Sequence, residues 1–204
     1  MKLTVEEISI RKDRVSKLFD DLVKVIPNIP ILTMSHLPLG LGNISTAKGF
    51  SFLLKEVIIQ NLVFSKDKLE IFKLNYSKDA KQPYDLEIQF EDHVDVFIKL
   101  KFANISGKPN KDGITRSNKL IRFLNDKENS CLFVVTFHLK FFESNSISLK
   151  NIVVMPIDWI ADIYVTPNKT SYMQSTYYRF NEKAIKRSRH TFLIEFEKVL
   201  SKRN

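Results

Sequence analysis

Polar and apolar residues alternate along two neighbouring stretches in the middle of the chain. The alternation runs over residues 84–90 and resumes over residues 94–101. A period of two is typical of strands that bury one face. The three polar residues between the stretches, Glu91 to His93, have the length of a turn. The pattern therefore predicts a β-hairpin at the centre of the fold.

Apolar residues at helical spacing predict four helices. The first covers residues 5–26 and ends before Pro27, and the second begins at a cap on Ser45 or Thr46 and runs to about Leu62. Two more are expected over residues 114–125 and 181–201. The first helix is expected to bury Ile8, Val15, Leu18, Phe19, Leu22 and Val25. That stripe packs either on its own domain or on a second subunit.

Further strands are predicted on both sides of the hairpin. Apolar runs bounded by turn-forming residues place them over residues 69–75, 131–142 and 147–157. Residues 27–42 read as an irregular segment, because prolines and glycines interrupt them. Residues 77–82 and 106–113 read as polar loops.

The strand periodicity also places charged side chains on common faces. Asp85 and Glu87 share one face of the first strand, and Asp95, Lys99 and Lys101 share one face of the second. If the two faces coincide, carboxylates meet lysines. One interpretation is a solvated face with cross-strand ion pairs. The other is a site where a carboxylate holds a hard divalent cation and a lysine offsets phosphate charge.

Asp85, the run from Phe97 to Lys101 and the following residues 104–106 resemble the catalytic core of type II restriction endonucleases, of the PD-(D/E)XK superfamily. The resemblance implies an α/β fold in which α-helices flank a mixed central β-sheet. It also implies Mg²⁺-dependent cleavage of double-stranded DNA by a homodimer, within a restriction-modification system. The run of residues 153–160, with Trp159, is similar to the late strand and turn of several such enzymes.

The resemblance assigns roles to particular residues. Asp85 matches the metal-binding aspartate and Lys101 the catalytic lysine. The family usually has an acid two residues before that lysine, where this chain has Lys99, and a second cation there is expected to repel a metal ion. Glu87 and Asp95 are candidates to replace the missing ligand beside Asp85. Glu56 is the acid on the second predicted helix, where the family often carries a glutamate nearer the helix start.

Composition agrees with a nucleic-acid partner. The chain has 204 residues, 44% of them hydrophobic, which suffices for one domain over residues 1–204. Its formal charge of +9 and pI near 9.5 indicate a polyanionic partner. Seven basic residues and one acid lie between residues 99 and 122, whereas residues 84–95 carry five acids without lysine or arginine.

The predicted DNA contacts follow the hairpin and recur near the C-terminus. Lysines favour phosphate, and arginine and asparagine can read base edges. The first group is Lys108, Asn110, Lys111, Arg116, Ser117, Asn118 and Lys119. The second is Gln174, Tyr177 and Arg179, with Asn168 and Lys169 before them. A solvated surface loop is the alternative for each group.

Other classes of site have no sequence signal. Cys131 is the single cysteine, so no intrachain disulfide is possible, and the four histidines form no zinc pattern. The chain has no phosphate-binding glycine loop and no apolar run long enough to span a bilayer. The charged N-terminal residues do not resemble a signal peptide, so a cytoplasmic location is expected.

We therefore expect sequence-specific cleavage of double-stranded DNA by an α/β restriction-endonuclease-like domain. Two alternatives stay open. The first is a DNA-binding protein on the same fold that does not cleave, because Lys99 stands where an acid is expected. The second is a nuclease that acts in repair or in mobile-element processing.

Overall fold

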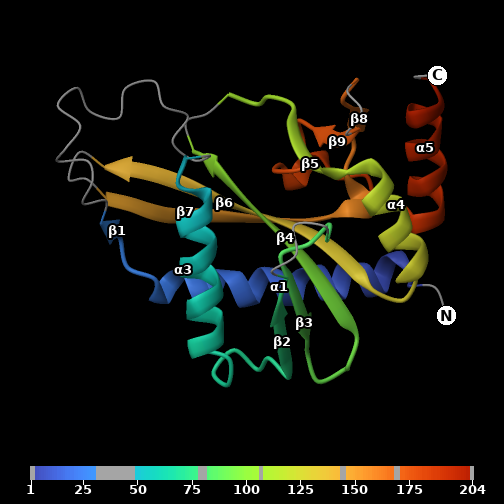
Figure 1. Cartoon of the computed structure of the whole chain (residues 1–204). Coiled ribbons are helices and arrows are strands. Elements are labelled where there is room, and N and C mark those ends of the chain that lie inside the picture. The colour runs from blue at the N-terminus through green and yellow to red at the C-terminus, as the bar shows by residue number, and fades with distance from the viewer. Residues whose placement is uncertain are drawn as a thin grey trace.

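A six-stranded mixed β-sheet forms the centre of the computed structural model, which describes residues 3–30, 49–77, 82–105, 108–142, 146–167 and 171–202 (Figure 1). The strand order is β1-β7-β6-β4-β3-β2, and only β4 and β6 run parallel. The strands are β1 (Ile29–Pro30), β2 (Lys73–Tyr76), β3 (Leu86–Gln89), β4 (Asp95–Asn104), β6 (Cys131–Phe142) and β7 (Ser146–Pro156). The predicted hairpin is confirmed as β3 and β4.

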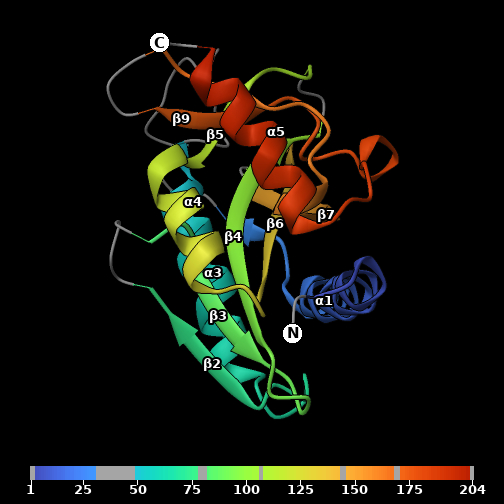
Figure 2. The ribbon, with the colours of Figure 1, turned by 90° about the vertical axis from the view of Figure 1, so that its right-hand side faces the viewer.

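Helices cover both faces of this sheet. In Figure 2, α1 (Val5–Val25) lies on one side of the sheet, and α3 (Ser51–Phe64) and α4 (Ser117–Asp126) lie on the other. Phe19 of α1 packs edge-on against Phe137 of β6, with ring centroids 5.5 Å apart. Phe97 of β4 packs in the same way against Phe123 of α4, at 4.9 Å. The predicted mixed sheet between helices is confirmed.

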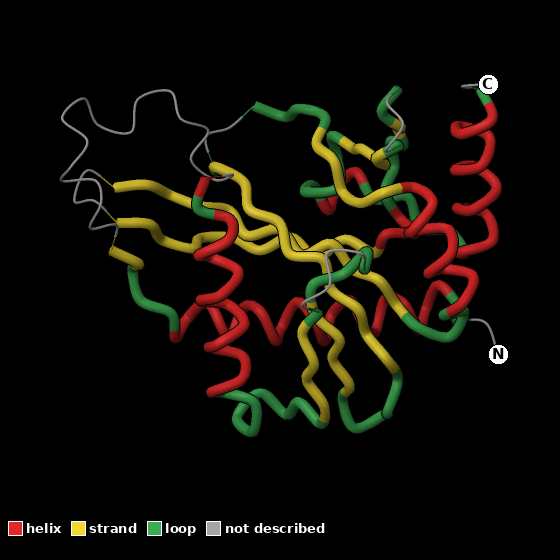
Figure 3. The backbone as a smooth tube through the Cα atoms, in the orientation of Figure 1, coloured by secondary structure: helices red, strands yellow, loops and turns green. Residues whose placement is uncertain are grey.

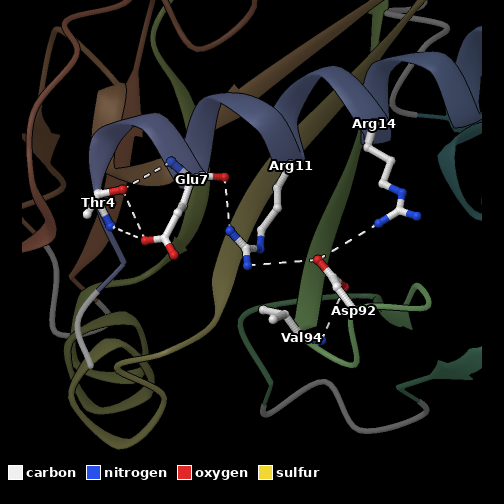
Figure 4. A network of polar contacts seen from close by, with 6 residues as sticks. All are labelled: Thr4, Glu7, Arg11, Arg14, Asp92 and Val94. Atoms are coloured by element: carbon white, nitrogen blue, oxygen red, sulfur yellow. Dashed lines mark hydrogen bonds and ion pairs between the residues drawn. The ribbon is translucent and has the colours of Figure 1, made fainter.

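The N-terminal end of α1 is fixed by a capping box and by ion pairs to the hairpin turn (Figure 4). The Thr4 hydroxyl accepts from the Glu7 amide, and the Glu7 carboxylate accepts from the Thr4 amide at 2.7 Å. Arg11 and Arg14 each lie 3.8 Å from the Asp92 carboxylate in the turn between β3 and β4. The hairpin is thus held to the helix that packs behind the sheet.

A second, three-stranded sheet lies beside the first and has the order β5-β9-β8 (Figure 3). Its strands are β5 (Asp112–Arg116), β8 (Tyr164–Val165) and β9 (Tyr172–Ser175). Strand β5 leads directly into α4, which returns the chain to β6, parallel to β4. The last helix, α5, spans Arg189–Ser201, and two 3-10 turns cover Ile157–Trp159 and Asn181–Lys183.

Several predicted boundaries are wrong. Residues 114–116 belong to β5 rather than to a helix, because Thr115 and Arg116 pair with β9. The last helix begins at Arg189 rather than at residue 181. The strand expected over residues 69–75 covers Lys73–Tyr76. Val25, which was placed on the buried stripe of the first helix, is 63% exposed.

Parts of other predictions lie outside the described residues. These are the helix cap at Ser45 or Thr46 and most of the irregular segment 27–42. The loop expected over residues 77–82 is described only at its two ends. Trp159, expected in a late turn, is 1% exposed and belongs to the core. Within the part of the chain that the structure describes, no helix is long and apolar enough to cross a membrane.

Candidate active site

Asp85 stands directly opposite Lys99 where β3 begins. Leu86 of β3 pairs with Ile98 of β4, and the Asp85 amide donates to the Ile98 carbonyl at 2.8 Å. Continuing this antiparallel register by one residue brings position 85 to position 99. The two side chains therefore lie on one face of the sheet, as the alternating pattern predicts, and their ion pair is 3.2 Å long.

The carboxylate of Asp85 is held on both of its oxygens. Oδ1 accepts from the Nζ of Lys55 at 2.9 Å and from the Nζ of Lys99 at 3.2 Å. Oδ2 accepts from the backbone amide of Leu100 at 2.8 Å. The Asp85 side chain is only 15% exposed. Two ammonium groups and one amide thus surround a single, largely buried carboxylate.

Lys55 was not among the predicted site residues. It lies on α3, three residues before the buried Ile58 and seven before the buried Leu62, and so on the face that α3 turns to the sheet. A lysine on the buried face of an amphipathic helix is unusual unless it has a partner. That signal is present in the sequence, although it does not identify Asp85 as the partner.

Burial and neighbouring charges together shift the pKa of Lys99. Loss of solvent lowers the pKa of the Lys99 ammonium from its ordinary value, Asp85 opposes this, and the nearby Lys55 lowers the pKa further. The Lys99 side chain is 20% exposed. Asp85 therefore opposes the effect of burial and stabilises the ammonium form of Lys99.

A cavity of about 660 Å³ opens beside this cluster. Asp85, Lys55 and Lys99 line it, and Glu56 contributes a second carboxylate from α3. Phe52 and Tyr76, also on its wall, are 77% and 48% exposed. The volume lies within the range of small-molecule sites, about 300–1,000 Å³. The cavity combines cationic, acidic and aromatic groups.

Lys101 belongs to a different cluster from Asp85. Its Nζ lies 2.8 Å from Oδ2 of Asp112 and donates to the Gly113 carbonyl at 2.6 Å, both in β5. The Tyr178 hydroxyl donates to the same Asp112 oxygen at 3.1 Å. Lys101 therefore joins the central sheet to the second sheet. The resemblance implied that Lys101 joins Asp85 in one site, whereas its contacts with Asp112 and Gly113 are both in β5.

The carboxylates proposed as metal ligands are also spread over the sheet. The Glu87 carboxylate lies 3.3 Å from the Nζ of Lys73 in β2, and the Asp95 carboxylate accepts from the side-chain amide of Gln89 at 2.5 Å. Among the described residues, no group of three or more His, Cys, Asp or Glu side chains is arranged to hold a metal ion. Glu87 and Asp95, the candidates for the second ligand beside Asp85, thus have other partners, and the three carboxylates do not form one metal-binding group.

A magnesium ion does not fit the donor set at Asp85. Mg²⁺ requires oxygen ligands. Here both carboxylate oxygens already accept hydrogen bonds, and two of the three donors are ammonium groups, which repel a cation. We therefore assign no chemical step to a metal ion at this site.

The predicted DNA contacts divide by exposure. Lys108, Asn110, Lys111, Arg116 and Asn118 are exposed. Lys119 and Gln174 are partly buried, and Tyr177 is 38% exposed. Asn168 and Lys169 lie outside the described residues.

Two of the predicted DNA contacts are buried within the protein, which does not leave them open to DNA. Ser117 is fully buried where α4 begins, and Arg179 is 7% exposed. The Arg179 guanidinium donates to the Lys108 carbonyl at 3.0 Å and to Oδ1 of Asn110 at 3.3 Å. Arg179 therefore positions the basic segment 108–111 from beneath.

Comparison with solved structures finds a match to "NlaIV restriction endonuclease", with a TM-score of 0.51 and 14% sequence identity. The match covers 72% of this chain and 64% of that enzyme. No family model matches the chain. The comparison with curated proteins also finds no match.

The mixed sheet, its flanking helices and this match give the class of the protein. The chain has a restriction-endonuclease-like α/β fold. At 14% identity the likeness establishes the fold alone. The activity has to be argued from the site.

Proposed function

We propose that this chain is an endonuclease that cleaves double-stranded DNA at the cavity beside Asp85 and Lys99. One observation carries the proposal. In a restriction-endonuclease-like fold, a carboxylate at the start of β3 directly faces a lysine on β4, and the pair lines an open cavity. We propose further that it is a type II enzyme of the PD-(D/E)XK superfamily and that it cleaves at specific sequences. We also propose that it acts as a homodimer, in the cytoplasm, within a restriction-modification system.

The charges of the site suit a phosphodiester. Lys55 and Lys99 bring two positive charges to the single carboxylate of Asp85. The cluster of Lys55, Lys99 and Asp85 carries one net positive charge, which offsets the negative charge that grows on a phosphate in the transition state. Asp85 orients both ammonium groups, and the Leu100 amide fixes the carboxylate. Exposed Lys108 and Lys111 lie on the segment that follows β4 and can bind neighbouring phosphates.

Magnesium is the cofactor that the resemblance implies for this reaction. The donor set at Asp85 does not fit the ion, so its requirement has to be measured. The same contacts favour a second candidate function. A carboxylate neutralised by two lysines suits a protein that binds DNA on this fold without cleaving it.

The test compares cleavage with binding for three proteins. A mixed-sequence duplex is incubated with wild type, Asp85→Ala and Asp21→Ala, in Mg²⁺ and in EDTA, and binding is followed by fluorescence anisotropy. Asp21 is the matched control, since it also pairs with a lysine, Lys24 at 2.8 Å, but lies on α1 behind the sheet. We expect Asp85→Ala to lose cleavage and to keep binding, while Asp21→Ala keeps both.

Two results would contradict the proposal. Tight duplex binding without cleavage by wild type, in either buffer, would support the second candidate. Absence of duplex binding by wild type would exclude both functions.

A further inference from the structure

The site is unusual in that two lysines share one carboxylate oxygen. Lys55 and Lys99 come from different elements, α3 and β4, and both donate to Oδ1 of Asp85. Each ammonium group has three donors. Among the described residues, Asp85 is the single hydrogen-bond acceptor recorded for either of them. Both side chains line the cavity, with exposed fractions of 30% and 20%. Donor capacity is therefore available toward the cavity.

The charges of the side chains that line the cavity select among anions; the two lysines and the two acids, Asp85 and Glu56, sum to zero. Lys55, Lys99 and Asp85 together carry one positive charge, which matches the single negative charge of a phosphodiester. Glu56 lines the same cavity and repels a second negative charge. A phosphodiester is therefore favoured over a phosphate monoester, which carries about two negative charges near neutral pH.

The cavity wall also offers surface to a base or sugar. Phe52 and Tyr76 are both largely exposed aromatic side chains on this wall. Aromatic side chains stack with any nucleobase, because every base has a π-face. Cationic and aromatic groups in one cavity are the combination that binds nucleic acid without reading its sequence.

We propose that Lys55 and Lys99 form a phosphodiester-binding site that takes the place of a divalent cation in this cavity. The proposal rests on the proposed function for the identity of the ligand, a DNA backbone phosphate. It adds that the contact needs no metal ion and that Lys55 of α3 is a binding residue. Asp85 acts in this site by holding the two ammonium groups 2.9 and 3.2 Å from one oxygen.

The experiment measures the affinity of a short labelled duplex for wild type and three variants, in EDTA and in Mg²⁺, over a range of salt concentrations. Lys55→Gln removes the charge, and Lys55→Arg restores it. Lys24→Gln is the matched control, because Lys24 also pairs with an aspartate at 2.8 Å but lies on α1. Circular dichroism checks that each variant is folded.

We expect wild type to bind equally well in EDTA and in Mg²⁺. Lys55→Gln should weaken binding about tenfold and reduce the slope of log K against log salt by about 0.9, the value for one lost phosphate contact. Lys55→Arg should recover most of the affinity, and Lys24→Gln should match wild type. These results together would support the site.

The results that would overturn this proposal alone differ from those that would also overturn the proposed function. If wild type binds duplex DNA but requires Mg²⁺, or if Lys55→Gln binds as well as wild type, this proposal is overturned and the proposed function stands. If wild type binds no duplex in either buffer, the proposed function is overturned, and this proposal with it.

Discussion

Asp85 and Lys99 face each other across the hairpin, and this contact could be predicted from the sequence. Strand periodicity and a turn of fixed length determine which side chains meet across a hairpin, so this pair was predictable. The partner from α3 was not, since the docking of a helix on a sheet depends on tertiary packing. Lys101 shares the face of Lys99, but it pairs with Asp112, which the sequence had placed in a loop.

Replacing Lys99 by glutamate tests whether the cation at this position prevents metal binding. Lys99→Glu sets two carboxylates opposite each other and removes one ammonium group from Asp85. We expect Mn²⁺ binding, followed by electron paramagnetic resonance, to increase, because a carboxylate supplies an oxygen ligand that an ammonium group cannot. Lys140→Glu, an equal charge change at an exposed position on β6, is the control. If wild type cuts and Lys99→Glu does not, then Lys99 is itself catalytic.

Cys131 allows a second prediction for a single residue. The thiol is 3% exposed, and burial raises its pKa from 9.0 to about 12. The folded thiol therefore stays protonated where the unfolded thiol ionises. Its stabilising contribution is complete below pH 9.0 and is lost as pH rises toward about 12.

Urea unfolding at several pH values measures this effect. We expect the free energy of unfolding to fall by about 1 kcal/mol between roughly pH 8 and 10 in wild type, beyond any change in Cys131→Ala. The native thiol should also resist a disulfide reagent that reacts readily after unfolding. Equal pH dependence of wild type and Cys131→Ala would contradict the assignment.

At the scale of elements, long periodic segments were predictable and short ones were not. The helix α1 and the strand β6 have the expected bounds within one residue. Strands β5, β8 and β9 contain two to five residues, too few for an alternating pattern to stand out. Their sheet forms through pairing between segments about 60 residues apart, which local sequence does not encode.

The start of α5 shows a signal that was present but misread. The helix was expected from residue 181, yet the Ser188 side chain accepts from the Thr191 amide and caps a helix that begins at Arg189. Arg187 and Arg189, on either side of this cap, are engaged within the protein. Arg187 pairs with Glu195 at 2.9 Å, and Arg189 donates to the Ser130 carbonyl at 2.6 Å.

The contact between the two sheets can be tested through Lys101 and Asp112. Their side chains are 18% and 23% exposed, so removing one partner leaves the other charge poorly solvated. We expect Lys101→Met and Asp112→Asn each to lower the free energy of unfolding by about 1–3 kcal/mol. The double variant should cost less than the sum of the two, as a double-mutant cycle in urea will show.

The cycle also separates two roles of Lys101. If Lys101→Met abolishes cleavage while Asp112→Asn, at similar loss of stability, retains it, Lys101 acts in the reaction. If both variants lose stability and activity in parallel, the role of Lys101 is to hold the second sheet. Additive effects in the cycle would show that the two side chains do not stabilise each other.

At the scale of the whole molecule, the basic residues between positions 99 and 122 divide into partly buried ion-pair partners and exposed charges. Lys99 and Lys101 are engaged by Asp85 and Asp112. The exposed positive charge of this segment lies instead on Lys108, Lys111, Arg116 and Arg122. The Nζ of Lys111 lies 3.6 Å from the centroid of the Tyr164 ring. With Arg179 beneath it, the segment is a positioned basic surface rather than a loose tail.

That surface predicts how DNA affinity depends on salt. Each phosphate that a lysine neutralises adds about 0.9 to the slope of log K against log salt, because bound counterions are released. Lys108→Ala combined with Lys111→Ala should therefore reduce the slope by about 1.8 and weaken binding to all duplex sequences alike. Lys140→Ala with Lys150→Ala is the matched control, since both lysines are exposed and lie near the Phe142 ring on β6.

Base reading is separable from phosphate binding in the same titration. Arg116, Asn118 and Gln174, changed singly to alanine, should each cost about 1–3 kcal/mol on a preferred site and far less on other sequences if they contact bases. Equal weakening on all sequences would make them phosphate contacts. An affinity that ignores salt, or a control pair that loses as much slope as Lys108 and Lys111, would show that DNA does not bind across this surface.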